Sequence, residues 1–184
     1  PDCTGVRGIA RDLAAAGLGT LKPFDIAAPI EGSYDSPVAW AIADDGNACS
    51  YVVGRHFRGV TNRPSPQWVQ DRLRAVGLRP ISALVDVTNY VSLDLGRPLH
   101  VFDAGKLTSN TLTMRRARDG ENFMALVERE YTLDGEMTVI GDGDKAEAVA
   151  GVMGGLDTSC TETTTDVFLE VALFDPISVA TTGR

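Results

Sequence analysis

The apolar residues near the start of the chain recur every three or four positions, which is the spacing of one face of an α-helix. Val6, Ile9 and Leu13 follow this spacing. The pattern predicts a short helix that ends at one of the glycines that follow it, Gly17 or Gly19.

Two further helices are expected near the middle of the chain. In the first, Ser65 is expected to be the N-cap, Pro66 the first helical residue and Gly77 the stop, so that the helix covers 66–76. The second is expected to run from Ser82 to a Leu-Gly-Arg-Pro turn. Its Val and Thr residues also fit a strand, because they are weak helix formers.

Outside these helices the pattern is that of β-structure, rich in β-branched and aromatic residues and interrupted by Gly and Asp. The expected strands lie in ACSYVVGRHFRGV, LHVFD, TLTMRRA, MTVIGD, AVAGVM and VFLEVALF. A stretch rich in Pro, Gly, Ser and Asp predicts a domain boundary near Asp35. We therefore expect 1–35 to belong to a neighbouring domain and its linker, and 36–184 to form the main module. Its fold class is α+β, a β-rich layered (ββα-like) arrangement with mixed or antiparallel sheets and helices packed on one side.

Composition and charge narrow the possible functions. The chain has 184 residues, is 43% hydrophobic and carries a net charge of −8, which argues against a protein that grips nucleic acid over its whole surface. No apolar run is long enough to span a membrane, and the first residues lack the pattern of an export signal, so neither a membrane nor export is expected. One basic region stands out, as a solvated face or as a contact for a partner. It contains Arg55, Arg58, Arg63, Arg72, Arg74 and Arg79.

The three cysteines give no metal site. Cys3, Cys49 and Cys160 are far apart and form no pattern with histidine, so we expect reduced cytoplasmic thiols and no zinc. The common hydrolase and nucleotide motifs are also missing from the sequence.

Candidate chemistry is concentrated around a Gly-Arg-Pro turn. His56 lies in an expected strand and is expected to be structural. His100 follows the turn and is either an acid/base group or a helix cap. Thr88 and Asn89 either belong to a site or bond to backbone carbonyls. Glu170 lies in an apolar strand and either faces solvent or has a partner inside. The AGVMGG segment either receives a ligand with its backbone or forms a bulge.

These residues carry a family resemblance. The segments RPSPQWVQDRLRAVGLRPISALVDVTNYVSLDLGRPLHVFD and AVAGVMGGLDTSCTETTTDVFLEVALFDPISVATTGR resemble the editing module of the β subunit of bacterial phenylalanyl-tRNA synthetase. The opening PDCTGVRGIARDLAAAGL resembles the segment that leads into that module. The resemblance implies a cytoplasmic ligase subunit whose module hydrolyses mischarged Tyr-tRNA(Phe). Its implied partners are the aminoacylated 3′ end of tRNA(Phe), the synthetase α subunit and the rest of the β subunit, with no membrane.

The resemblance also implies roles for single residues. His100 and Asn89 would be catalytic and, with Thr88, would hold the ester and the attacking water. The other implied residues would bind the tyrosine side chain, its phenol through a carboxylate and a backbone N–H and its ring through an apolar wall. They are Glu170 and Gly151 for the phenol, and Ala150, Pro98 and Ala172 for the ring.

No cofactor and no metal are implied for this fragment, since ATP and Mg²⁺ would serve the adenylation site of the α subunit. The sequence departs from the family pattern by a shortened loop near Ala125–Val127, and it reads as a fragment that does not aminoacylate alone. Two alternatives stay open, an inactive scaffold that contacts tRNA and an amino-acid-binding barrel.

Overall fold

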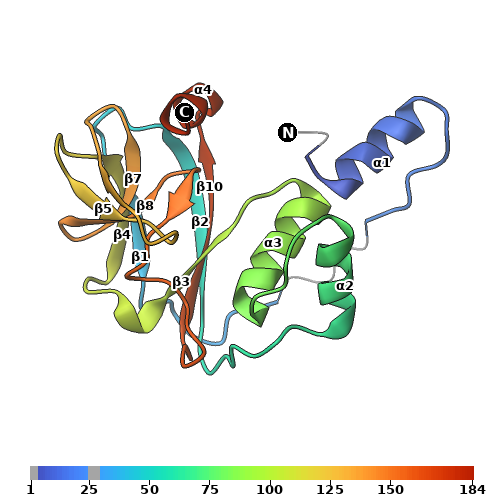
Figure 1. The fold of residues 1–184 in the computed structure, drawn as a ribbon, viewed down its shortest axis with the longest axis horizontal. Helices are drawn as coiled ribbons and strands as arrows, with labels where there is room; N and C mark the ends of the chain where they lie inside the picture. The colour runs from blue at the N-terminus through green and yellow to red at the C-terminus, as the bar shows by residue number, and fades with distance from the viewer. Residues whose placement is uncertain (1–3, 25–29) are drawn as a thin grey trace.

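The structure is a computed structural model that describes residues 4–24 and 30–184 (Figure 1). The helices are α1 (Val6–Ala15), α2 (Gln67–Ala75), α3 (Ala83–Leu95) and α4 (Pro176–Thr182), with a short 3-10 helix η1 (Ala104–Lys106). The strands are β1 (Ala39–Ile42), β2 (Cys49–Phe57), β3 (His100–Asp103), β4 (Thr111–Arg116), β5 (Asn122–Met124), β6 (Glu130–Thr132), β7 (Thr138–Asp142), β8 (Lys145–Val149), β9 (Met153–Gly154) and β10 (Val167–Phe174).

The strands form three sheets. The largest has the order β1-β4-β7-β8-β9, the second has the order β2-β10-β3, and β5 pairs with β6 in a hairpin. Only β1 and β4 run parallel among the pairs of the described chain. Helices α1, α2 and α3 gather on one side of the sheets, and α4 lies apart from them (Figure 1). The predicted α+β class with mixed sheets is confirmed.

The main hydrophobic core lies between the two larger sheets. Phe102 and Phe168 enter it from the three-stranded sheet, and Leu112, Met114 and Ile140 enter it from the five-stranded sheet. Each of these side chains is almost fully buried, because alternate residues of a strand point to the same face. A second cluster lies beneath the β5–β6 hairpin.

The predicted helices are confirmed, with corrections at the start of α2, where Pro66 is the N-cap and Gln67 is the first helical residue. Ser65 does not cap this helix, because its hydroxyl donates a hydrogen bond to the buried carboxylate of Asp86 on α3. Asp86 also accepts a hydrogen bond from the Ile81 N–H at 2.8 Å. Gly77 ends α2 as expected, with a φ of +85°, and α3 ends at the left-handed Gly96.

The expected strand in AVAGVM is wrong. β8 ends at Val149, and the chain then turns through residues 150–152 before β9 begins at Met153. The N–H of Val152 donates to the Val149 carbonyl at 3.0 Å, and Gly151 has a φ of +70°. Glycine adopts this left-handed conformation without steric cost, so the segment folds back as a hairpin.

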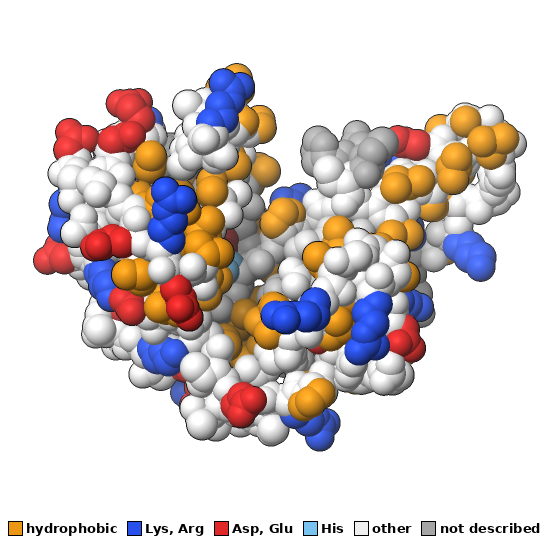
Figure 2. Space-filling model, in the orientation of Figure 1, with side chains coloured by type: hydrophobic (Ala, Val, Ile, Leu, Met, Phe, Trp, Pro, Cys, Tyr) orange, Lys and Arg blue, Asp and Glu red, His pale blue; other side chains and the backbone are white. Residues whose placement is uncertain are grey.

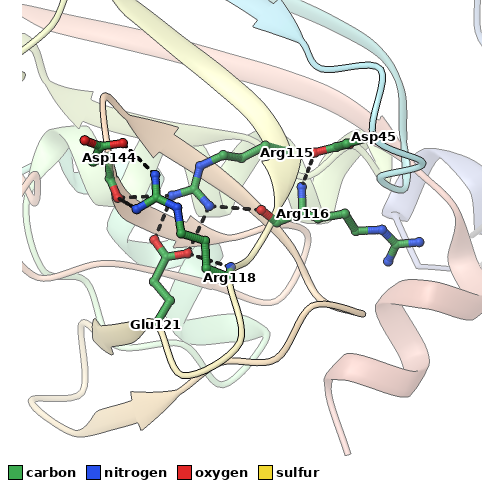
Figure 3. A network of polar contacts seen from close by, with 6 residues as sticks. All are labelled: Asp45, Arg115, Arg116, Arg118, Glu121 and Asp144. Atoms are coloured by element: carbon green, nitrogen blue, oxygen red, sulfur yellow. Dashed lines mark hydrogen bonds and ion pairs between the residues drawn. The ribbon is translucent and has the colours of Figure 1, made fainter.

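A network of polar contacts surrounds the C-terminal end of β4 (Figure 3). The Arg115 guanidinium donates two hydrogen bonds to the Glu121 carboxylate, at 2.7 and 2.9 Å, and holds the loop before β5 against the large sheet. Arg118 pairs with Asp144 at 2.6 Å. The Arg116 N–H donates to Asp45 at 2.7 Å, which joins this end of β4 to the loop after β1.

Residues ahead of β1 contact the edge strand β2. The Tyr34 hydroxyl lies 3.0 Å from Nδ1 of His56 and donates to the His56 carbonyl at 3.1 Å. Arg55 donates to the Ile30 carbonyl at 2.6 Å. The structure thus places His56 in a structural contact, while the domain boundary near Asp35 stays a prediction.

The contact between Gly54 and Phe168 gives a test of how the small sheet packs. A Cβ on Gly54 would lie 2.1 Å from Cζ of Phe168, whose side chain is 1% exposed. We expect Gly54→Ala to lower the free energy of unfolding by about 2–3 kcal/mol, because the ring has no room to move. Urea unfolding measures this change. Gly19→Ala is the control, since Gly19 faces open space, and it should alter stability by less than about 0.5 kcal/mol. Equal effects of the two substitutions would contradict the packing.

Candidate functional site

A cavity of about 560 Å³ lies where β3, β10, the turn after β8 and α4 meet. Its walls are largely apolar, as is usual for small-molecule sites. Pro98 and Leu99 line it ahead of β3, Ala172 and Phe174 line it from β10, and Val179 and Ala180 line it from α4.

The two ionisable groups of the cavity lie side by side. Glu170 on β10 is paired directly with His100 on β3 in the antiparallel ladder, and both residues line the cavity. Paired residues project from the same face of a sheet with Cβ atoms about 5 Å apart. The sheet register therefore brings together a carboxyl group and an imidazole that are 70 residues apart in sequence.

The Glu170 side chain points inward. The residue is 4% exposed, and its buried Oε1 has no hydrogen-bond partner within the described part of the chain. Burial raises the pKa of Glu170 to about 7, since the charged form loses its hydration. A buried acceptor without a partner is the group that a ligand hydroxyl or N–H would satisfy.

His100 is held as a neutral imidazole. Burial lowers its pKa to about 4, so the ring is uncharged at neutral pH. The ring contacts Phe102 edge to face, with centroids 4.4 Å apart, and its Nε2 is buried without a partner among residues 4–24 and 30–184. A Cβ on Gly154 would lie 2.4 Å from Cε1 of His100. The bare backbone of Gly154 thus forms one wall of the imidazole site.

The turn after β8 brings backbone groups to the opposite wall. Gly151 lines the cavity, and within the described residues its N–H makes no hydrogen bond. A Cβ there would lie 2.9 Å from Val179, so α4 packs closely on this turn. Ala150, in contrast, is 4% exposed and belongs to the core between the sheets, outside the lining of the cavity.

The structure gathers most, but not all, of the residues singled out from the sequence. His100, Glu170, Gly151, Ala172 and Pro98 all line the cavity. Thr88 and Asn89 lie on α3 and are not among the lining residues. The Thr88 hydroxyl donates to the Val85 carbonyl at 2.8 Å, which is a bond within its own helix. The catalytic role of Asn89 and the substrate-binding role of Thr88 stay predictions.

Two parts of the site were missed in the sequence analysis. The helix α4 was not expected, although the Asp-Pro at its start is a recognisable signal, because Asp175 caps it by accepting from the Ser178 N–H at 2.8 Å. The contact of Gly154 with His100 has no signal in the sequence, because it depends on how β9 lies against β3.

The described residues contain no group of three or more His, Cys, Asp or Glu side chains placed to hold a metal ion. Cys49 and Cys160 are free thiols, and burial raises the pKa of Cys160 to about 11. Cys3 lies outside the described residues. No helix in the described ranges is long and apolar enough to cross a membrane.

The opposite pKa shifts of the paired groups predict how stability depends on pH. Glu170 keeps a proton in the folded state up to a pKa of about 7, so its contribution to the free energy of unfolding falls as pH rises from 4.5 to 7. His100 takes up its proton only near a pKa of about 4, so its contribution rises between pH 4 and 6.5. The two contributions oppose each other over most of this window.

Substitution of one of the two groups should therefore reveal the pH dependence that the other contributes to stability. Glu170→Gln should make stability rise more steeply with pH than in the parent chain, and His100→Asn should make it fall, each by up to ~1.4 kcal/mol per pH unit. Urea unfolding between pH 4.5 and 6.5 measures the slopes. Slopes parallel to that of the parent in both variants would show that neither group is shifted as described.

Comparisons with known proteins agree with this architecture. The family model described as "B3/4 domain" matches residues 48–184. The chain is 55% identical over 186 residues to the phenylalanine–tRNA ligase β subunit of Paramagnetospirillum magneticum, and 56% identical over 184 residues to that of Mesorhizobium japonicum. Each match covers 100% of this chain and 23% of the relative, so the chain spans about a quarter of the length of these curated relatives.

A solved structure shows the same fold. It is an N-terminal fragment of the phenylalanyl-tRNA synthetase β subunit from Pyrococcus horikoshii, with a TM-score of 0.58 and 16% sequence identity. The likeness covers 97% of this chain and 54% of that fragment. The resemblance seen in the sequence motifs is confirmed by these matches.

Proposed function

We propose that this chain, which belongs to the B3/4 domain family, is the editing module of a phenylalanine–tRNA ligase β subunit and hydrolyses the ester of tyrosine mistakenly joined to tRNA(Phe). The observation that carries the proposal is the buried, unpartnered carboxyl oxygen of Glu170 beside His100 in an apolar cavity. The 55% identity to β subunits supplies the substrate class.

The cavity suits a tyrosine side chain better than a phenylalanine side chain. Ala172 and Pro98 supply apolar surface for the ring, while the Glu170 carboxyl group and the Gly151 N–H bind the phenol. A bound phenylalanine ring would cover both polar groups without giving either a partner, at about 1–3 kcal/mol each. A synthetic site cannot strongly reject one added hydroxyl, so a second site that requires the hydroxyl restores accuracy.

Hydrolysis of this ester requires little of the protein beyond placing a water molecule and the ester carbonyl close together. An aminoacyl ester is an activated acyl group, so a water molecule held near its carbonyl gains much of the rate through proximity. The neutral His100, whose Nε2 has no hydrogen-bond partner in the described chain, orients this water and accepts its proton at Nε2 as the hydroxide attacks the carbonyl carbon. The terminal ribose hydroxyl leaves with a proton returned from the imidazole.

The remaining parts of the enzyme complete this scheme. In the proposal the module needs no cofactor of its own, and ATP and Mg²⁺ act at the adenylation site of the α subunit. The partners are the aminoacylated 3′ end of tRNA(Phe), the α subunit and the rest of the β subunit, in the cytoplasm.

Removal of the carboxyl group tests the specificity of the site. In the full α₂β₂ enzyme, Glu170→Ala should reduce the preference for tyrosyl-tRNA over phenylalanyl-tRNA by roughly 10- to 100-fold, which corresponds to one or two unsatisfied polar groups. Deacylation of both charged tRNAs measures the preference. Glu147→Gln is the matched control, because Glu147 is equally buried at 4% and lies outside the cavity lining. An unchanged preference in Glu170→Ala would refute the site.

Removal of the imidazole tests the chemistry separately. His100→Ala should slow hydrolysis of tyrosyl-tRNA by about 100-fold or more, as for loss of a general base, and should keep the preference for tyrosine. Single-turnover deacylation gives the rate, and aminoacylation by the same preparation shows that the enzyme is intact. If His100→Ala and Glu170→Ala both edit normally, the module is a scaffold that contacts tRNA.

A further inference from the structure

A second cavity, of about 370 Å³, lies where the start of α1 packs against the end of α3. Three arginines line it, Arg7 and Arg11 from α1 and Arg97 from the turn after α3. The other lining residues are Gly8, Leu21, Leu95 and Gly96. No Asp or Glu is among the described residues that line it, although the chain as a whole carries a net charge of −8.

Close backbone packing brings these arginines together. A Cβ on Gly5 would lie 2.4 Å from the Gly96 nitrogen and 2.9 Å from the Leu95 carbonyl carbon. Only glycine allows this approach, because any larger residue would separate the two helices. Arginines about 90 residues apart in sequence therefore line one hollow.

Two of the three guanidinium groups, those of Arg7 and Arg97, keep their charge among the described contacts, whereas Arg11 is paired. Arg7 lies over the Phe24 ring at 4.5 Å, a contact that positions the charge and leaves it positive. Arg11 has a long ion pair of 3.6 Å with Asp12, and both side chains are about half exposed. Arg97 is exposed, and within the described ranges its side chain makes no hydrogen bond or ion pair. Planar guanidinium groups match the oxygen geometry of phosphate, to which they donate paired hydrogen bonds.

The arginine cavity adjoins the site of the proposed hydrolysis. Arg97 lines the arginine cavity, and the next residue, Pro98, lines the cavity that holds Glu170 and His100. Consecutive Cα atoms are only 3.8 Å apart, so one peptide unit separates the two walls.

We propose that the arginine cavity binds phosphodiester groups of the RNA strand that carries the ester, and so directs its aminoacylated end into the adjoining cavity. This inference rests on the proposed editing function. The net charge of −8 favours a local contact of this kind over a broad one. On the face shown in Figure 2, acidic side chains are mixed with basic ones.

The basic region identified in the sequence, between Arg55 and Arg79, is less suited to this contact than the arginine cavity. Arg55 bonds to the Ile30 carbonyl, Arg58 stacks on Tyr34 and Arg74 pairs with Asp71. Arg72 donates to the Tyr90 hydroxyl. Arg55 and Arg58 line a third cavity, but the acidic Glu31 lines it with them. Arg72 and Arg74, on α2, line neither that cavity nor the arginine cavity.

The test measures how the affinity of the full α₂β₂ enzyme for tyrosyl-tRNA depends on salt. Each lost phosphate contact should lower the slope of log affinity against log salt by about 0.7. At about 0.15 M salt, the KM for deacylation should therefore rise about fourfold in Arg97→Ala and about 14-fold in Arg7→Ala/Arg97→Ala, with kcat nearly unchanged. Arg97→Lys keeps the charge and should retain the slope.

Arg74→Ala is the matched control, because it removes the same charge from α2 and should leave the slope unchanged. A wild-type slope in Arg7→Ala/Arg97→Ala would overturn the inference, and the proposed function would still stand if Glu170→Ala loses its preference. Two other results would also overturn the inference, if the salt slope of Arg7→Ala/Arg97→Ala is that of the wild type. A higher KM for ATP would assign the cavity to a free nucleotide, and dissociation of the subunits would assign it to a protein partner.

Discussion

The pairing of β10 with a strand on each side is the constraint on which the rest of the structure depends. Glu170 lies opposite Gly54 of β2 and opposite His100 of β3. The Phe168 ring fills the space that Gly54 leaves open. A slip by one residue would turn the carboxyl group and the aromatic ring to the other face of the sheet. The packing of Phe168 therefore fixes the register that places the acid beside the imidazole.

The cavity obtains its chemistry from burial more than from charge pairing. Desolvation raises the pKa of Glu170 to about 7 and lowers that of His100 to about 4, so neither group needs an ionic partner inside the protein. Helix α4 contributes the apolar side chains of Val179 and Ala180 to the wall of this cavity. In such surroundings a hydrogen bond to a ligand is stronger than in water, and its absence is more costly.

The sequence predicted the parts of the fold that depend on local spacing. Helices α2 and α3 and most strands follow from apolar periods and from turn residues such as Gly77. Ser65 was misassigned because its hydroxyl can cap a helix or reach Asp86, and only tertiary packing decides between them. The pairing of His100 with Glu170 depends on strand register, and the convergence of Arg7 with Arg97 depends on helix packing, so neither has a local signal.

A carboxyl group buried without a partner is a liability for the folded chain. An apolar residue of similar size at position 170 would remove the desolvation cost and fill the same volume. Laboratory selection for heat resistance alone would then favour replacing Glu170, and under the proposed function the hardier protein would lose the group that recognises a phenol. Under that proposal, thermal tolerance and translational accuracy place opposite demands on this one side chain.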